Sequence, residues 1–388
     1  MARVRDRIAF TRIDRWLGFA GVLAAAVVAL LLWLSQAMIA PPRPRIEGSE
    51  RPTIGLTVRS AGDRVVVARA AGASRTSGLR AGDRIVGIDD IDTPTAAGLE
   101  ERVRSRPDGT FVRIRARRGE DGVLAEVPVS IKKVSPEDQG LPYEDVAFRN
   151  ADGLVLRGWF IPAPSSAGGN APAIVYGHGN ATDRRHWLPI AGAVHDAGFA
   201  QLLFDFTGRG ESDGEVITLG FHEARDLRAG LDFLAARPEV DPLRLALAGR
   251  SMGAVAAIYE AADDARVKAV VLDSPYADLP ALLGRAIHER HLPAFLVRPL
   301  LMRFAGWRAN YDPSSVRPVE VIRRVRAPIL LLHGEADTVI PFDDAKALER
   351  AATGPLLLVP LPGLDHNTPR PPEYDARILA FLARSLAR

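Results

Sequence analysis

One serine between two glycines constrains this chain of 388 residues more than any other feature. The Gly-x-Ser-x-Gly motif at residues 249–253 follows an apolar run and precedes a run of small residues. A strand, this motif and then a helix predict a sharp turn that exposes the serine hydroxyl. Glycines are expected there because strand and helix must approach closely around a strained residue. Ser251 is therefore the predicted nucleophile, and the backbone N–H of Met252 is expected to face the charge developing on an attacked carbonyl oxygen.

A serine hydroxyl is a weak nucleophile, so it needs a base and a group that orients the base. Downstream of such a turn, the acid is expected first and the histidine later. Asp337 and His366 appear in that order, each just after a short apolar strand, where open α/β sheets place their ligands. His366 is the predicted general base and acid, and Asp337 its orienting carboxylate. Asp273 and Glu335 remain alternatives for the acid.

A second oxyanion donor is expected from residues 177–181, which follow another apolar strand. Two backbone N–H groups are needed near the nucleophile, one of them from an earlier loop. Asn180 is the predicted donor in this loop, beside Met252.

From about residue 141 the chain alternates strands with helices, which predicts a mostly parallel sheet. The expected strands are 146–149, 154–161, 173–176, 200–204, 243–248, 269–272, 329–332 and 356–359, and the expected helices are 188–197, 223–236 and 375–386. Residues 146–161 are expected to form an antiparallel hairpin.

Residues 141–388 resemble an α/β-hydrolase, in particular the serine-aminopeptidase-like and related esterase, thioesterase and acyl-protein hydrolase groups. The resemblance rests on five motifs in order: His-Gly-Asn-Ala at 178–181, Asp-Phe-Thr-Gly-x-Gly-x-Ser-x-Gly at 205–214, Gly-x-Ser-Met-Gly at 249–253, His-Gly-x-x-Asp at 333–337 and Asp-His at 365–366. It implies a sheet with helices on both faces, a Ser–Asp–His triad, and neither metal nor cofactor. It leaves the acyl substrate open.

The segment 274–326 separates two core strands by more than an ordinary loop. Helices are expected at 279–290, 294–305 and 319–325, and in such hydrolases an insertion here forms a lid. Its apolar side chains are expected either to line an acyl pocket or to pack against the core; they include Leu282, Phe295, Leu296, Leu300 and Phe304.

The N-terminus predicts a membrane anchor. Residues 17–40 carry no charge, and the first 18 of them are apolar or glycine, which at 1.5 Å per residue reaches about 30 Å. The preceding segment 1–16 is rich in arginine, which favours a cytoplasmic N-terminus and an extracytoplasmic catalytic domain, periplasmic in a bacterium. A signal peptide cleaved near residues 35–37 is the alternative. The proline-rich segment 41–50 is expected to be a stiff linker.

Residues 51–134 are expected to form a small, mainly-β domain that resembles a bacterial PDZ domain of the protease-associated type. The resemblance rests on Gly-Leu-x-x-Gly-Asp-x-Ile-x-x-Ile-Asp at 78–89. PDZ domains bind an extended C-terminal peptide by strand addition. The resemblance puts the peptide-binding loop at Ile54, Gly55 and Leu56; a PDZ-shaped spacer without a ligand is the alternative.

Composition excludes other classes. The net charge is +3 and no basic stripe is interleaved with aromatic residues, so no nucleic-acid partner is expected. The chain has no cysteine, which excludes disulfides, thiolate metal sites and cysteine nucleophiles. The sequence predicts a membrane-anchored serine hydrolase of esters or thioesters, acting on a small or lipid-like acyl substrate, with a PDZ module for a protein partner. A serine aminopeptidase, and a PDZ-based binding protein with a non-catalytic hydrolase scaffold, are the alternatives.

Overall fold

The computed structural model describes residues 36, 38–41, 50–54, 56–62, 64–70, 72–92, 95–105, 110–128, 130–164 and 170–387. Most of the predicted anchor at 17–40, and Gly55 of the predicted peptide loop, lie outside these residues. Within the described part of the chain, no helix is both long and apolar enough to cross a bilayer.

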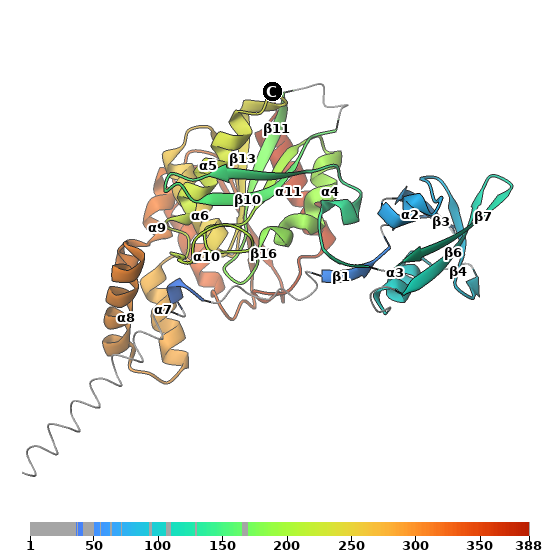
Figure 1. Cartoon of the computed structure of the whole chain (residues 1–388). Coiled ribbons are helices and arrows are strands. Elements are labelled where there is room, and N and C mark those ends of the chain that lie inside the picture. Colours follow the sequence, from blue (N-terminus) through green and yellow to red (C-terminus); the bar gives the residue numbers. More distant parts are fainter. Residues whose placement is uncertain are drawn as a thin grey trace, which may run out of the picture.

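An eight-stranded sheet organises residues 144–387 (Figure 1). Its strands follow the order β16-β15-β14-β13-β11-β12-β10-β9. The six strands from β16 to β12 run parallel, whereas β10 is antiparallel to both β12 and β9. The strands are β9 (Glu144–Arg149), β10 (Val155–Ile161), β11 (Ala171–Gly177), β12 (Ala200–Phe204), β13 (Val240–Arg250), β14 (Val267–Asp273), β15 (Ile329–Gly334) and β16 (Leu356–Leu361).

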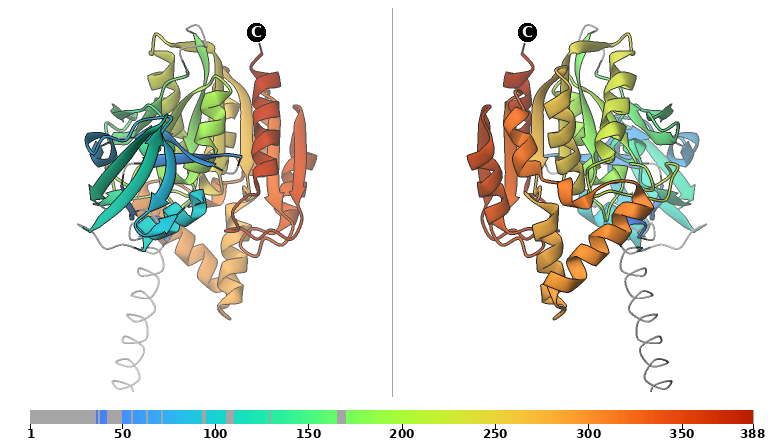
Figure 2. Two further views of the ribbon diagram at one scale, coloured as in Figure 1. Left: turned by 90° about the vertical axis from the view of Figure 1, so that its right-hand side faces the viewer. Right: turned by 90° about the vertical axis from the view of Figure 1, so that its left-hand side faces the viewer.

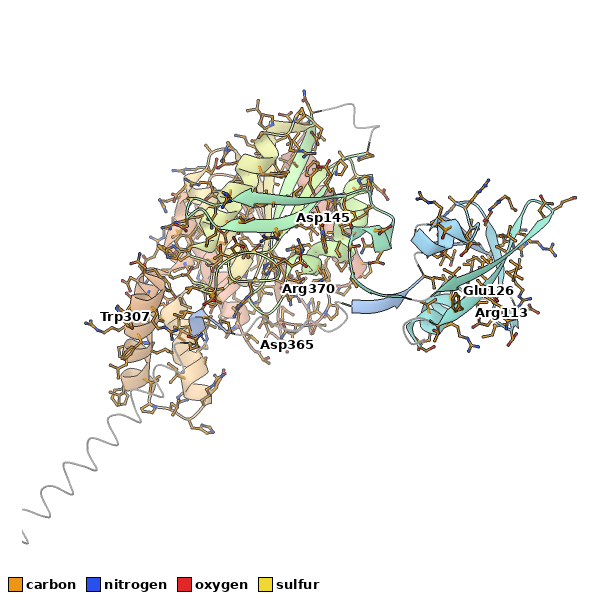
Figure 3. All side chains as sticks on the ribbon, in the orientation of Figure 1. Arg113, Glu126, Asp145, Trp307, Asp365 and Arg370 are labelled. Carbon is orange, nitrogen blue, oxygen red and sulfur yellow. The ribbon has the colours of Figure 1, made fainter. Side chains whose placement is uncertain are left out.

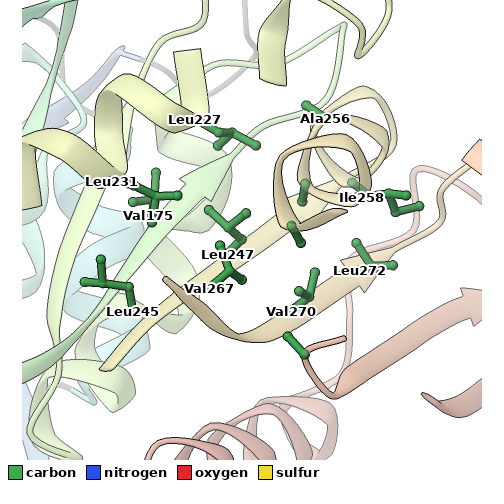
Figure 4. Close-up of a cluster of buried hydrophobic side chains, with 14 of the residues drawn as sticks. Val175, Leu227, Leu231, Leu245, Leu247, Ala256, Ile258, Val267, Val270 and Leu272 are labelled. Carbon is green, nitrogen blue, oxygen red and sulfur yellow. The ribbon is translucent and has the colours of Figure 1, made fainter. Parts of the chain in front are cut away.

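Helices cover both faces of this sheet because its strands carry apolar residues on both sides. In β13, Leu245 and Leu247 face one core, whereas Ala246 and Ala248 face the other. Figure 4 shows the leucine side, where α5 and α6 supply the opposing side chains. The helices on that face are α5 (Glu223–Ala235), α6 (Met252–Asp263) and α10 (Phe342–Ala351); α4 (Leu188–Asp196) and α11 (Pro372–Ser385) cover the other.

The insertion between β14 and β15 forms a helical hairpin that projects from the body (Figure 2). Its helices are α7 (Leu279–Glu289) and α8 (Ala294–Ala309), so α8 is one turn longer than expected. The expected third helix is shorter: α9 (Pro318–Val321) passes into a 3₁₀ turn. Of the apolar residues named for the lid, Leu282 packs against a buried cluster, as one alternative expected. Phe295 and Leu296 are 83% and 54% exposed, so these two do not pack against the core.

The N-terminal sheet has the order β2-β3-β4-β6-β7, with β5 paired to β4. Its elements are β2 (Leu56–Ala61), β3 (Arg64–Ala70), α2 (Gly72–Thr76), β4 (Arg84–Ile88), β5 (Ile91–Asp92), α3 (Ala96–Arg104), β6 (Phe111–Arg118) and β7 (Asp121–Pro128). A separate ribbon pairs β1 (Glu50–Thr53) with β8 (Ser130–Lys133). β7 and β8 therefore belong to different sheets, although they follow each other closely in the chain.

Candidate active site

The serine turn, residues 249–253, joins β13 to α6 at the carboxyl edge of the sheet. Ser251 has φ 50° and ψ −116°, a strained conformation for a non-glycine residue. A Cβ on Gly249 would lie 2.2 Å from the carbonyl oxygen of Gly253. A Cβ on Gly253 would lie 2.3 Å from the carbonyl oxygen of Gly177. Both glycines are therefore required by the close approach of β13, α6 and β11.

Asp337 and His366 are brought together from two neighbouring strand ends. The Nδ1 of His366 lies 2.7 Å from Oδ2 of Asp337, and both side chains are buried. The other carboxylate oxygen of Asp337 accepts the backbone N–H groups of Val339 and Ile340 at 2.9 and 2.7 Å. These bonds fix the carboxylate, which in turn fixes the ring and leaves Nε2 for proton transfer.

The loop that carries His366 is tied to the serine turn. Arg250, the residue before the serine, donates from Nη2 to the carbonyl oxygen of His366. Asp365 accepts the N–H of His366 at 2.7 Å and that of Thr338 at 2.7 Å. These backbone hydrogen bonds hold the pKa of Asp365 below its usual range. The histidine loop, the Asp337 loop and the serine turn therefore form one connected rim.

No hydrogen bond joins the hydroxyl of Ser251 to His366 among the described residues. The two residues are placed on the same rim by Arg250, which is adjacent to one and bonded to the other. Nucleophile–base hydrogen bonds are commonly long or poorly aligned until substrate binds. The arrangement therefore suits a base that engages the hydroxyl during reaction.

The two alternative acids have other surroundings. Asp273 binds Arg370, with Oδ2 3.0 Å from Nε, and its Oδ1 accepts the hydroxyl of Ser274 at 2.9 Å. Burial pushes the pKa of Asp273 upward, but the arginines outweigh it and hold the pKa below its usual range. Glu335 is exposed. Asp337 is thus the carboxylate that the structure pairs with His366.

The loop after β11 lies against the serine turn. A Cβ on Gly179 would lie 3.7 Å from Cβ of Ser251. Asn180 is the next residue along the chain. Arg209 holds Asn180 through Nε to its carbonyl oxygen at 2.9 Å and through Nη2 to its side-chain oxygen. Among described residues, the backbone N–H groups of Asn180 and Met252 donate to no protein acceptor. Both therefore stay available to an oxyanion.

Three further histidines surround the site and stay neutral. Burial lowers the pKa of His178, whose Nε2 accepts the N–H of Phe206 and whose Nδ1 therefore donates to the carbonyl oxygen of Gly179. Burial and then Arg250 lower the pKa of His186 to about 3. Burial also lowers the pKa of His333. In the described part of the chain, no three His, Asp or Glu side chains are grouped to hold a metal ion.

Comparison with known proteins places the chain in a family. Residues 174–380 match the profile of the Alpha/beta hydrolase family. The chain belongs to this family. The hydrolase is 36% identical over 235 residues to the uncharacterized protein Rv2307c of Mycobacterium tuberculosis (strain H37Rv), covering 61% of this chain and 75% of that protein. It is 31% identical over 227 residues to YfhR of Escherichia coli K12, covering 58% and 73%.

Among solved structures, this hydrolase is similar to the Pyrococcus furiosus esterase Pf2001, with 25% identity and a TM-score of 0.54. That likeness covers 66% of this chain and 96% of the esterase. The α/β-hydrolase fold predicted from the sequence is confirmed. The role of Arg250 as the link between the serine turn and the histidine loop is not predicted from the sequence, although its place inside the Gly-x-Ser-x-Gly motif is a signal.

Proposed function

We propose that this hydrolase cleaves a carboxylic ester or thioester through an acyl-enzyme on Ser251. His366 removes the proton from the hydroxyl as Oγ attacks the acyl carbonyl carbon. The oxyanion is stabilised by the N–H groups of Met252 and Asn180. His366 then gives its proton to the leaving alcohol or thiol as the acyl bond breaks. A water, deprotonated by His366, attacks the acyl-enzyme and releases the acid and the free serine.

The observation that carries this proposal is the Asp337–His366 pair, whose histidine loop Arg250 ties to the turn that bears the strained Ser251. Burying such a polar pair costs free energy, and a purely structural scaffold does not require the pair. The similar Pyrococcus furiosus protein is named an esterase, which supports ester over amide cleavage. A serine aminopeptidase would use the same three side chains, so substrate turnover must separate the two.

The test is hydrolysis of p-nitrophenyl esters of increasing acyl length, compared with aminoacyl p-nitroanilides. The proposal expects turnover of esters, faster than of amides, and its loss in Ser251→Ala by a factor of about 10⁴ or more. Ser105→Ala, an exposed serine on the N-terminal domain, is the matched control and should retain full activity. Amide turnover exceeding ester turnover would favour the peptidase. A Ser251→Ala variant as active as the wild type would reject the mechanism.

The N-terminal domain is proposed to bind a protein C-terminus as a PDZ module. β2 lies at the edge of its sheet, paired there only with β3 among described strands, and α3 lies against it. Extended peptides add to such an edge. Peptides with a free C-terminal carboxylate should bind the full chain at least tenfold more tightly than their C-terminal amides. Equal binding of the two, or no binding, would leave the domain as a spacer.

Residues 17–40 are proposed to anchor the chain in a membrane, with the N-terminus cytoplasmic and the hydrolase outside. The support is the length of the uncharged run and the arginines before it. In spheroplasts, whose outer membrane has been opened, an added protease should digest the hydrolase, and carbonate washing should leave the chain in the membrane fraction. Release by carbonate, or protection from protease, would contradict the anchor or its orientation.

A further inference from the structure

The outward face of α8 is apolar. Among described residues, Phe295, Leu296 and Trp307 are large hydrophobic side chains that α8 exposes, at 83%, 54% and 76%. Pro299 and Arg303 are the other exposed positions between them. At about 100° per residue, these five positions fall within an arc of about 120°. Trp307 projects from α8 in Figure 3. A helix normally turns such a face toward a core.

The charge of α8 has one sign. Residues 294–309 include Arg298, Arg303 and Arg308 and no acidic residue. Arg298 and Arg303 also line a groove of about 510 Å³ beside Trp307 and Met302. Apolar and aromatic side chains interleaved with arginine are typical of helices that lie in the interface of an anionic bilayer. Packing against a protein core would not explain the arginines of α8. Binding of nucleic acid would not explain its exposed phenylalanine and leucine.

The end of the apolar N-terminal run meets this same hairpin. Gln36 accepts a hydrogen bond from Arg308 of α8 through its side-chain oxygen. Met38 and Ile39 are buried in a cluster with Leu301 and Ala305 of α8. The uncharged run 17–40 therefore ends against α8, on the side of the helix opposite its exposed face, which puts the proposed bilayer surface near α8.

The base of the hairpin contacts the site. The cluster that buries Ile39 also contains Val255 of α6 and Ile340, whose N–H binds Asp337. Arg209, which holds the oxyanion loop, also donates to the carbonyl oxygen of Pro41 at 3.4 Å. A membrane contact at α8 is thus continuous with the residues that position the triad.

We propose that the outward face of α8 inserts into the headgroup region of an anionic phospholipid bilayer, as a second membrane contact beside the anchor. The apolar and aromatic side chains enter the acyl boundary, and the arginines bind lipid phosphates. This contact fixes the orientation of the hydrolase, so that the rim carrying the triad stays near the membrane surface. The proposal rests on the proposed anchor and is independent of the chemistry at Ser251.

The absence of native cysteine allows a direct test. The full chain is reconstituted in vesicles of phosphatidylcholine and phosphatidylglycerol, with one cysteine carrying an environment-sensitive NBD dye. The test positions are Phe295→Cys and Trp307→Cys. The control is Leu243→Cys, which is 72% exposed at the start of β13, at the opposite end of the strand from Ser251. Circular dichroism checks that each labelled protein is folded.

We expect the labels at positions 295 and 307 to shift to shorter wavelength in vesicles and to be quenched at least threefold more by doxyl-labelled lipid than the label at position 243. Equal, weak quenching at all three positions would overturn the proposal. A shift of the label to shorter wavelength that grows with protein density and is insensitive to doxyl lipid would show that a second copy covers α8. This result would also overturn the proposal. Failure of the chain to associate with vesicles would contradict both the proposed anchor and this contact. Loss of esterase activity alone would contradict neither.

Discussion

Replacement of Gly253 by alanine tests how the serine turn is built. The added Cβ would lie 2.3 Å from the carbonyl oxygen of Gly177 and 2.7 Å from that of His178. Both contacts are with backbone atoms at the end of β11, so no side chain can rotate away. Because β11 is bonded on both sides, by β12 and β13, the strand end must shift or α6 must move outward.

The size of the effect follows from these contacts. Overpacking of this kind typically costs about 1–3 kcal/mol. Alanine regains about 1 kcal/mol as the better helix former, which leaves a net loss of about 0–2 kcal/mol of unfolding free energy. The moved atoms precede Asn180, the proposed oxyanion donor, and losing one such donor costs about 10²–10³ in rate. Reactivity should therefore fall far more than stability.

The assay is the rate of Ser251 labelling by a fluorophosphonate, measured beside the urea midpoint of unfolding. Gly192→Ala is the matched control, because this glycine lies within α4 and its nearest neighbour to a new Cβ is 3.9 Å away. The control should keep the wild-type labelling rate and gain about 0.5–1 kcal/mol of stability. A Gly253→Ala protein that labels within threefold of the wild-type rate would show that the turn tolerates a Cβ at this position.

Three other substitutions probe the site and its support. Asp337→Asn should lower kcat about 10⁴-fold in steady-state ester hydrolysis, with a small change in KM, because the imidazole loses its preferred tautomer; a loss under tenfold would contradict its role. Arg250→Met should lower kcat about 10–100-fold, since a charged hydrogen bond to the carbonyl oxygen of His366 is worth about 1.5–3 kcal/mol; an unchanged kcat would show that the loop is held otherwise. Burial raises the pKa of Asp226 to about 7 in the folded protein. The contribution of Asp226 to the free energy of unfolding is therefore fully present below about pH 4, and about 4 kcal/mol of it is lost as the pH rises through 7. Urea titrations of Asp226→Asn should therefore show a shallower fall between pH 5 and 8 than the wild type, and an identical slope would contradict this pKa.

The sequence predicts the strands and helices of the hydrolase closely where apolar runs are short and bounded by turn residues. β12 matches its expected range in full, and α5 differs by one residue. The pairing of Asp337 with His366 followed from chain order, because the carboxyl ends of parallel strands meet at one edge. Such features are local in sequence or fixed by topology.

Other features depend on contacts between distant residues, which one sequence does not reveal. The bond from Arg250 to His366 joins residues 116 positions apart, and nothing in either local pattern requires it. α8 is apolar on both sides, so its composition could not show that Phe295 faces outward while Leu301 faces inward. The ribbon of β1 and β8 was missed because its two strands lie at opposite ends of the N-terminal domain.

The convergence of Ser251, Asp337 and His366 can be measured through the site of fluorophosphonate modification, mapped by mass spectrometry of the full chain. We predict a single adduct on Ser251 that forms in the wild type and is almost lost in His366→Ala, because the imidazole must take the hydroxyl proton. An unmodified Ser251 in folded protein, or equal labelling with and without the imidazole, would contradict the convergence of these residues into one catalytic centre.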